Sequence, residues 1–207
     1  MARPPLSRRR LLGLDRSGPP PPETARGAPL RPFTLPNAIG VTRLCLIPVF
    51  LIVALGSGDG RDALASALFI GIAWGDQLDG VTARLTGQYS RLGALLDPLT
   101  DRLLVVSGVV VCWHFELLPR WALAVLVVRE LAMLVLTQAA LRRGFDLGIN
   151  MVGRWAVWPV MAAIATALIV DSVVAELLLY IGLAMTLAAT ALYLQDGYRQ
   201  LKASSST

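Results

Sequence analysis

The sequence predicts an all-α, polytopic membrane protein: a bundle of six transmembrane helices with a polar cavity that faces the cytoplasm. Of the 207 residues, 55% are hydrophobic and only 16% are charged, which is typical of a membrane protein rather than a soluble domain. Six apolar stretches follow one another with short connections, and each is close to the roughly 20 residues that cross a bilayer. Four aspartates are placed at the second and third of these stretches, where unpaired charges would be costly.

The chain begins with a segment unlike the rest. Residues 1–32 are rich in arginine and proline, with Pro19–Pro22 consecutive. Such a segment cannot bury a core, so we expect a disordered basic tail that rests on anionic headgroups. The membrane domain is expected over residues 33–200, and residues 201–207 form a short polar tail.

The expected spans cover residues 36–56, 62–86, 91–114, 119–142, 151–171 and 173–195. The apolar part of the second, from Ala63 to Gly75, has only 13 residues. It crosses the membrane only if the same helix continues through the first two aspartates, and the third span must contain the other two. We therefore expect the four carboxylates to lie below the headgroups, within the inner third of the bilayer.

The distribution of basic residues predicts the orientation. With the N-terminus in the cytoplasm, the inside segments hold eight arginines up to Arg43 and then Arg84, Arg91, Arg102, Arg142, Arg143, Arg154, Arg199 and Lys202. The outside loops hold only Arg61 and Arg120, and Arg129 lies mid-span. The positive-inside rule then predicts a multi-pass protein of the cell membrane, with both termini and the mouth of the aspartate cluster in the cytoplasm. The arginine-rich, Ala-, Gly- and Leu-rich composition suggests a GC-rich bacterial genome, so the membrane is expected to be a bacterial inner membrane.

The aspartates are spaced to share helix faces. Asp76 and Asp79 are three residues apart, and Asp97 and Asp101 are four apart, so each pair lies on one face of its helix. A turn around Gly87 to Ser90 would bring the two faces together. Four carboxylates supply only oxygen ligands, which suits Mg²⁺ or Mn²⁺. Such a cluster can hold two divalent ions, or one ion beside a free base.

The spacing D-x2-D-G-x2-A-R-x8-G-x3-D-x3-D is filled by Asp76, Asp79, Gly80, Ala83, Arg84, Gly93, Asp97 and Asp101. This pattern resembles the signature of the CDP-alcohol phosphatidyltransferase family (class I). The resemblance implies a homodimeric enzyme that transfers a phosphatidyl group from CDP-diacylglycerol to an alcohol and releases CMP. It implies that Asp76, Asp79 and Asp97 are metal ligands, and that Asp101 also lies at the metals and acts as general base on the acceptor hydroxyl.

Residues next to the aspartates are candidates for binding CDP-diacylglycerol. The small side chains of Gly80 and Ala83 would let a nucleotide approach the helix, although close helix packing would also favour small residues. Arg84 could bind a phosphate, or serve as a cytoplasmic anchor. Ser90 lies in the turn, where the family contacts the nucleotide, but serine also commonly forms turns.

The first span opens with Pro36-Asn37 and Thr42-Arg43, which is similar to the opening of the phosphatidylglycerophosphate synthase branch of the family. Asn37 and Arg43 could therefore reach the diphosphate of CDP. Since an apolar run follows Arg43 directly, its side chain should face inward or extend to the interface.

Three arginines lie near the cytoplasmic ends of the fourth and fifth spans: Arg142, Arg143 and Arg154. They could bind the phosphate of the acceptor, or could be ordinary positive-inside anchors. The branch usually has Gly-Lys where this chain has Gly153-Arg154, which leaves the acceptor open. Arg129-Glu130, near the middle of the fourth span, should each have a partner on another helix.

The partners expected are CDP-diacylglycerol, a glycerol-based alcohol and membrane lipids, with no nucleic acid. The sequence is similar both to synthases that use glycerol 3-phosphate and to cardiolipin synthases that use phosphatidylglycerol. A transporter or cation channel with intramembrane carboxylates is the main alternative, and it predicts ion flux without a need for Gly80 or Ala83. A catalytically silent, lipid-binding homologue is disfavoured by the intact signature.

Overall fold

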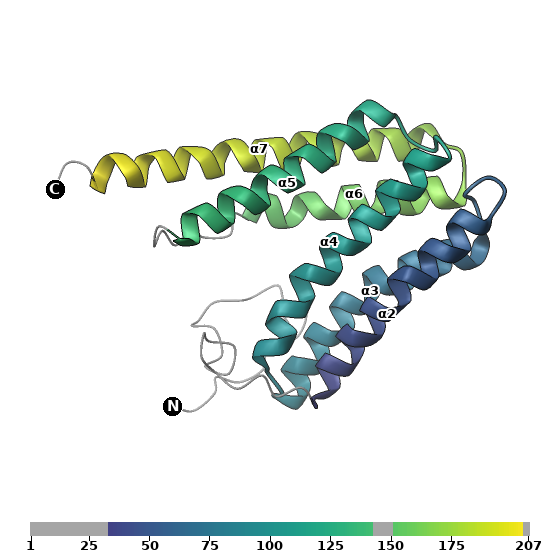
Figure 1. Cartoon of the computed structure of the whole chain (residues 1–207), viewed down its shortest axis with the longest axis horizontal. Helices are drawn as coiled ribbons and strands as arrows, with labels where there is room; N and C mark the ends of the chain where they lie inside the picture. Colours follow the sequence, from purple (N-terminus) through teal and green to yellow (C-terminus); the bar gives the residue numbers. More distant parts are fainter. Residues whose placement is uncertain (1–32, 143–150, 205–207) are drawn as a thin grey trace. The chain divides into compact units, whose positions relative to one another are not determined.

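The computed structural model describes residues 33–142 and 151–204, and every regular element within those ranges is an α-helix (Figure 1). The helices are α2 (Leu35–Gly56), α3 (Ala63–Thr86), α4 (Arg91–His114), α5 (Arg120–Arg142), α6 (Met151–Ile169) and α7 (Val173–Ser204). The all-α class is thus confirmed, and five helices have bounds within two residues of those expected. The last runs well past residue 195, because a polar sequence that carries few helix breakers continues the helix beyond its apolar part.

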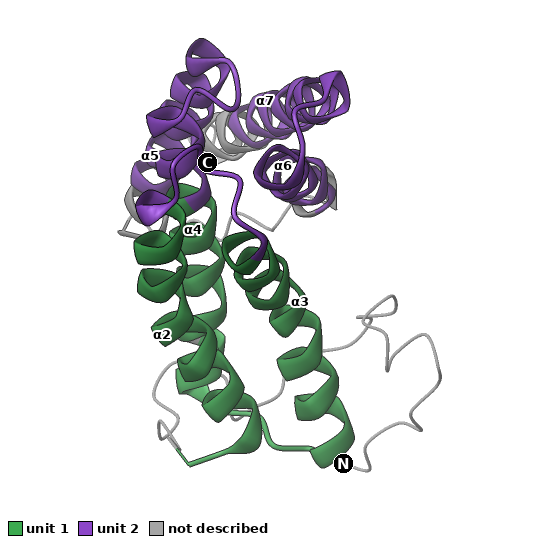
Figure 2. Cartoon of the chain, turned by 90° about the vertical axis from the view of Figure 1, so that its right-hand side faces the viewer, with its two compact units in different colours: residues 1–54, 64–107 green, residues 55–63, 108–207 purple. Residues whose placement is uncertain are grey.

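The helices group into two compact units (Figure 2). Unit 1 contains most of α2 and α3, together with α4 as far as Ser107. Unit 2 contains the end of α4, the connection around residues 55–63, and α5 to α7. All the aspartates of the sequence motif belong to unit 1.

Unit 1 is held together by apolar contacts between α2 and α3 and by hydrogen bonds at the N-terminal end of α2. Phe50 of α2 and Phe69 of α3 are fully buried, with ring centroids 5.4 Å apart. Thr34 caps α2, since its hydroxyl accepts a hydrogen bond from the Asn37 N–H at 3.3 Å. The proline at position 36 falls within the first turn, where a helix has no need of its N–H.

The turn between α3 and α4 is fastened to the beginning of α2. Gly87 ends α3 with a φ of 66°, a left-handed conformation that glycine adopts without strain. The side-chain oxygen of the next residue, Gln88, accepts a hydrogen bond from the Leu35 N–H at 3.0 Å. Ser90 then caps α4, with its hydroxyl accepting from the Gly93 N–H at 2.9 Å. The turn thus sets where the acidic face of α4 begins.

Unit 2 is built on the packing of α6 and α7. At Gly182 of α7, an added Cβ would lie 2.6 Å from Val160 Cγ2 and 2.9 Å from the Val160 backbone nitrogen of α6. The two backbones approach closely there because the glycine has no side chain. Trp121 of α5 stacks on Tyr180 of α7, with ring centroids 5.6 Å apart.

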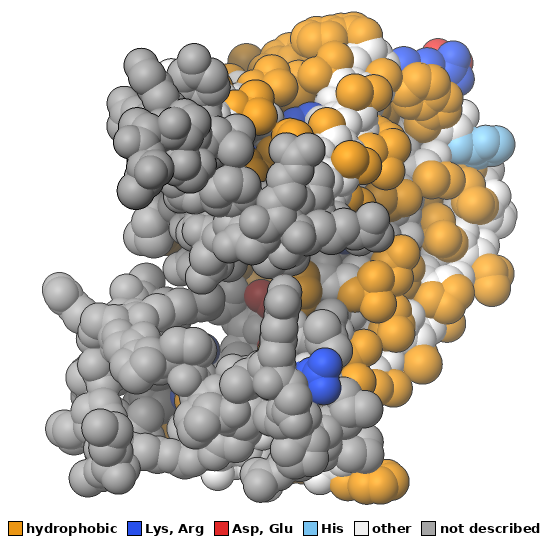
Figure 3. Space-filling view, turned by 60° about the vertical axis from the view of Figure 1, so that its left-hand side comes forward, with side chains coloured by type: hydrophobic (Ala, Val, Ile, Leu, Met, Phe, Trp, Pro, Cys, Tyr) orange, Lys and Arg blue, Asp and Glu red, His pale blue; other side chains and the backbone are white. Residues whose placement is uncertain are grey.

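The surface of the described residues is strongly apolar. Large hydrophobic side chains such as Ile52, Val128 and Val173 are 73%, 66% and 71% exposed. Figure 3 shows hydrophobic side chains spread across the described part of one face, with few charged side chains among them. Within the described ranges, Leu35–Gly56 and Val173–Gln195 are long and apolar enough to cross a membrane by themselves, and Trp155–Ile169 is a shorter apolar helix.

Candidate active site

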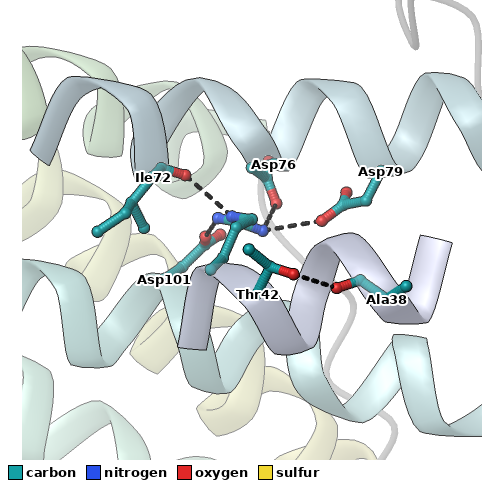
Figure 4. Close-up of polar contacts among 7 residues, drawn as sticks. Ala38, Thr42, Ile72, Asp76, Asp79 and Asp101 are labelled. Carbon is teal, nitrogen blue, oxygen red and sulfur yellow. Dashed lines mark hydrogen bonds and ion pairs between the residues drawn. The ribbon is translucent and has the colours of Figure 1, made fainter. Parts of the chain in front are cut away.

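The centre of unit 1 is a buried arginine surrounded by aspartates. Arg43 of α2, with its side chain 3% exposed, donates from Nη1 to Asp79 Oδ2 at 2.9 Å and to Asp76 Oδ1 at 3.4 Å. Its Nη2 donates to Asp101 Oδ1 of α4 at 2.9 Å, and its Nε donates to the Ile72 carbonyl at 2.9 Å (Figure 4). One guanidinium thereby joins carboxylates from α3 and α4, as its planar fork of donors allows.

The arginine reaches the aspartates because α3 has a glycine beside it. A Cβ added at Gly75 would lie 2.7 Å from Arg43 Cδ and 2.9 Å from Arg43 Cγ. The aliphatic part of the arginine therefore passes through a slot that any larger residue would close. Gly75 directly precedes the first aspartate of the motif, so the slot and the acidic face belong to the same turn of α3.

The predicted pooling of acids from two helices is present in this structure for three of the four aspartates. Asp76 and Asp79 of α3 and Asp101 of α4 meet at Arg43. Asp97 lies one turn before Asp101 on α4 and is partly exposed. Asp79 is almost fully buried, whereas Asp76 and Asp101 have side chains 34% and 37% exposed. The cluster is therefore partly exposed, through Asp76 and Asp101.

The donor set of this cluster fits a hard divalent cation, since it offers only carboxylate oxygens. The positions of these side chains do not yet form a metal site, because within the described part of the chain no three acidic, cysteine or histidine side chains are arranged so that they could hold an ion. Three of the carboxylates instead turn an oxygen toward the guanidinium. The residues thus suit a metal by chemistry, while their present orientation suits an arginine.

A second polar cluster lies at the N-terminal ends of α2 and α4. The Ser90 hydroxyl donates to Asn37 Oδ1 at 2.7 Å, and both residues are buried. A Cβ added at Gly93 would lie 2.9 Å from Asn37 Oδ1 and 3.2 Å from Ser90 Oγ. Two of the residues expected to bind nucleotide therefore contact each other, and the motif glycine leaves room for that contact.

The remaining motif residues lie along α3. Arg84 folds back over Gly80, since a Cβ added at Gly80 would lie 3.2 Å from Arg84 Nη1. Ala83 follows Gly80 by three residues and is partly exposed. The arginine thus lies over the small residue that was expected to admit the nucleotide, and both stay candidates for the same ligand.

The three arginines of the expected acceptor pocket lie outside the side chains that the structure describes. Arg143 lies outside the described residues, and Arg142 and Arg154 belong to α5 and α6 without a description of their side chains. Arg129 does have the expected partner on another helix, because its Nε donates to Thr190 Oγ1 of α7 at 3.0 Å. It also pairs with its neighbour Glu130.

Sequence reasoning missed the pairing of Arg43 with the aspartates and the slot at Gly75. A signal for the pairing was present, because a charged residue inside an apolar span needs a partner of opposite charge, and the aspartates are the nearest candidates. The slot depends on how α2 and α3 align, and no pattern within either helix predicts that alignment.

Unit 1 thus gathers acids of a D-x2-D pair on α3 and of a D-x3-D pair on α4 around one arginine. The model of the CDP-alcohol phosphatidyltransferase family matches residues 33–188. The chain belongs to this family, which confirms the resemblance noted in its sequence.

Relatives with assigned names support the same conclusion. The chain is 30% identical to the CDP-diacylglycerol–glycerol-3-phosphate 3-phosphatidyltransferase of Bacillus subtilis, over 84% of this chain and 100% of that protein. It is 35% identical to the cardiolipin synthase (CMP-forming) of Streptomyces coelicolor, over 68% of this chain and 67% of that protein. It is 34% identical to a probable phosphatidylglycerophosphate synthase of Mycobacterium tuberculosis, over 59% of this chain and 61% of that protein.

Proposed function

We propose that this chain transfers the phosphatidyl group of CDP-diacylglycerol to a hydroxyl of a glycerol-based acceptor, releasing CMP, as a step in phospholipid biosynthesis. The observation that carries the proposal is the cluster of motif aspartates from α3 and α4, in which Asp79 is buried while Asp76 and Asp101 are partly exposed. The names of the relatives, which are phosphatidyltransferases and CMP-forming synthases, support the same reaction.

The residues have distinct roles in this proposal. Asp76, Asp79 and Asp97 would hold two Mg²⁺ or Mn²⁺ ions, which when bound would neutralise the diphosphate and stabilise the departing CMP. Asp101 accepts the proton of the acceptor hydroxyl while the oxygen of that hydroxyl bonds to the phosphorus of the phosphatidyl group. The bond between that phosphorus and the oxygen that bridges the two phosphates breaks, and CMP leaves with the electron pair of this bond. Arg84, beside Gly80, donates to the phosphates of the nucleotide.

The lipid part of the substrate needs an apolar surface beside the acids. A groove of about 420 Å³ runs between α2 and α3, with apolar walls that include Ile39, Leu46 and Leu78. Arg43 and Gly75 border the same groove. We place an acyl chain of CDP-diacylglycerol there, since Arg43, which contacts the aspartates, borders this apolar groove within the same unit.

Two acceptors are supported by separate observations. Glycerol 3-phosphate is favoured by the Bacillus subtilis relative, which matches over its full length and whose name contains that acceptor. Phosphatidylglycerol is favoured by the cardiolipin synthase of Streptomyces coelicolor, which is more similar in sequence over a shorter stretch. Since both acceptors present a primary hydroxyl to the same phosphorus, the cluster serves either reaction.

The protein in this proposal spans the membrane six times, with both termini and the cluster at the cytoplasmic side, and forms a homodimer. Two helices that are apolar enough to cross by themselves and many exposed large hydrophobic side chains support the multi-pass arrangement. Labelling of single cysteines introduced at Arg61 and near the C-terminus would test the topology. Cross-linking in membranes would test the dimer.

The enzymatic test uses purified protein, CDP-diacylglycerol and each acceptor in turn. Acceptor-dependent release of CMP is expected with one of them, and it should vanish when divalent ions are chelated and return with added Mn²⁺. The product, phosphatidylglycerophosphate or cardiolipin, identifies the acceptor. Release of CMP at the same rate with water alone would reject phosphatidyl transfer to a glycerol-based acceptor.

A further inference from the structure

The guanidinium of Arg43 and a divalent ion compete for the same oxygen atoms. Arg43 takes one oxygen each from Asp76, Asp79 and Asp101, at 3.4, 2.9 and 2.9 Å. Under the proposed function, these carboxylates also bind metal or accept a proton. Each carboxylate has a second oxygen, so sharing is possible in space, but two cations on one carboxylate repel each other strongly away from water.

The side chain of Arg43 is held in the cluster by several contacts besides those with the aspartates. Its Nε donates to the Ile72 carbonyl, and its aliphatic part fills the slot at Gly75, so the guanidinium is held by groups other than the carboxylates as well. Burying several carboxylates without a counter-ion would be costly. A single positive charge that contacts three of them reduces that cost.

We propose that Arg43 is the internal counter-ion of the aspartate cluster and that it exchanges with divalent metal. In the metal-free enzyme, the guanidinium holds Asp76, Asp79 and Asp101 together. Metal binding weakens or breaks these ion pairs and turns the carboxylates toward the ion. This inference rests on the proposed function, because it takes the cluster to be a metal site.

The exchange would also supply a cation to the substrate. Arg43 borders the groove between α2 and α3, so a guanidinium released from the aspartates stays beside the space assigned to the lipid. There it can donate two parallel hydrogen bonds to a phosphate. The same residue thereby stabilises the carboxylates when no metal is bound to them and positions the diphosphate when metal is bound.

The test measures Mn²⁺ binding to full-length protein in detergent micelles, from the electron paramagnetic resonance signal of free Mn²⁺. Arg43→Met removes the competitor. Gly75→Ala keeps the arginine and all four aspartates but closes the slot, since the new Cβ would lie 2.7 Å from Arg43 Cδ. Arg61→Met is the matched control, because it removes the same charge from an ion pair with Asp171 in unit 2.

Exchange predicts that Arg43→Met and Gly75→Ala each bind Mn²⁺ roughly tenfold more tightly than wild type, as expected when a competing charge-assisted hydrogen bond is lost. Arg61→Met should bind like wild type. Without Mn²⁺, Arg43→Met and Gly75→Ala should both melt at lower temperature than wild type. Saturating Mn²⁺ should then raise their melting temperatures more than it raises that of wild type.

The opposite results separate this inference from the proposed function. If both variants bind Mn²⁺ no more tightly than wild type, the exchange is overturned. If wild type binds Mn²⁺ and Asp76→Asn binds it more weakly, the metal site is still supported. Absence of Mn²⁺ binding in wild type and all variants overturns both the metal site and the exchange. If Arg43→Met does not fold, Gly75→Ala decides alone.

Discussion

The motif glycine at position 93 should be required for packing rather than for contact with substrate. In Gly93→Ala, the added Cβ would lie 2.9 Å from Asn37 Oδ1 and 3.2 Å from Ser90 Oγ, and both side chains are buried. Overpacking of this kind costs about 1–3 kcal/mol. Loss of the Ser90–Asn37 hydrogen bond costs about 1 kcal/mol more, and alanine returns about 1 kcal/mol through its better helix propensity. The free energy of unfolding should fall by about 1–3 kcal/mol.

The assay is thermal unfolding in detergent micelles, with Gly71→Ala as the control. Gly71 lies in α3 of the same unit, and an added Cβ there meets nothing within 4 Å. Gly71→Ala should therefore match or slightly exceed wild type in stability, while Gly93→Ala melts several degrees lower, at about 2–4 °C per kcal/mol. A Gly93→Ala protein as stable as Gly71→Ala would refute the packing argument.

Three further outcomes are expected. Asp101→Asn should lower the rate of CMP release by at least about 100-fold while Mn²⁺ binding persists, and near-full activity would reject Asp101 as the base. Gly182→Ala should lower the melting temperature, because its Cβ would lie 2.9 Å from the Val160 backbone nitrogen, and unchanged stability would contradict the close contact of α6 and α7. Thr190→Val should destabilise by about 1–3 kcal/mol, since it leaves the Arg129 Nε without its acceptor on α7. Thr166→Val, which removes only a bond to Ala162 of the same helix, is the comparison, and equal effects would count against the interhelical bond.

The sequence predicted the helices well because their limits are marked by local chemistry. In the structure Thr34 and Ser90 cap α2 and α4, and Gly87 ends α3, so the chemistry at these ends agrees with the limits expected from hydropathy and from the turn at Gly87 to Ser90. The end of α7 was not, because the prediction followed hydropathy, and a helix can continue in water after its apolar part has ended. Membrane crossing and helix length are separate properties.

The candidate site was predictable in its members but not in its internal contacts. Helical spacing placed Asp76 beside Asp79 and brought α4 to meet them, as the structure shows for Asp101. The contact of Arg43 with these acids depends on the alignment of α2 against α3 and on the missing side chain of Gly75. Such contacts between helices leave no periodic pattern in the sequence. The sequence signals only that Arg43 needs a partner of opposite charge, and the structure shows which atoms meet.

The most direct test of the account is the release of CMP from CDP-diacylglycerol by purified wild type and Asp76→Asn, measured with glycerol 3-phosphate and with phosphatidylglycerol in the presence of Mn²⁺. The account predicts release by wild type that depends on one of these acceptors, and loss of that release in Asp76→Asn. Release at the wild-type rate by Asp76→Asn, or no release by wild type with either acceptor, would contradict it.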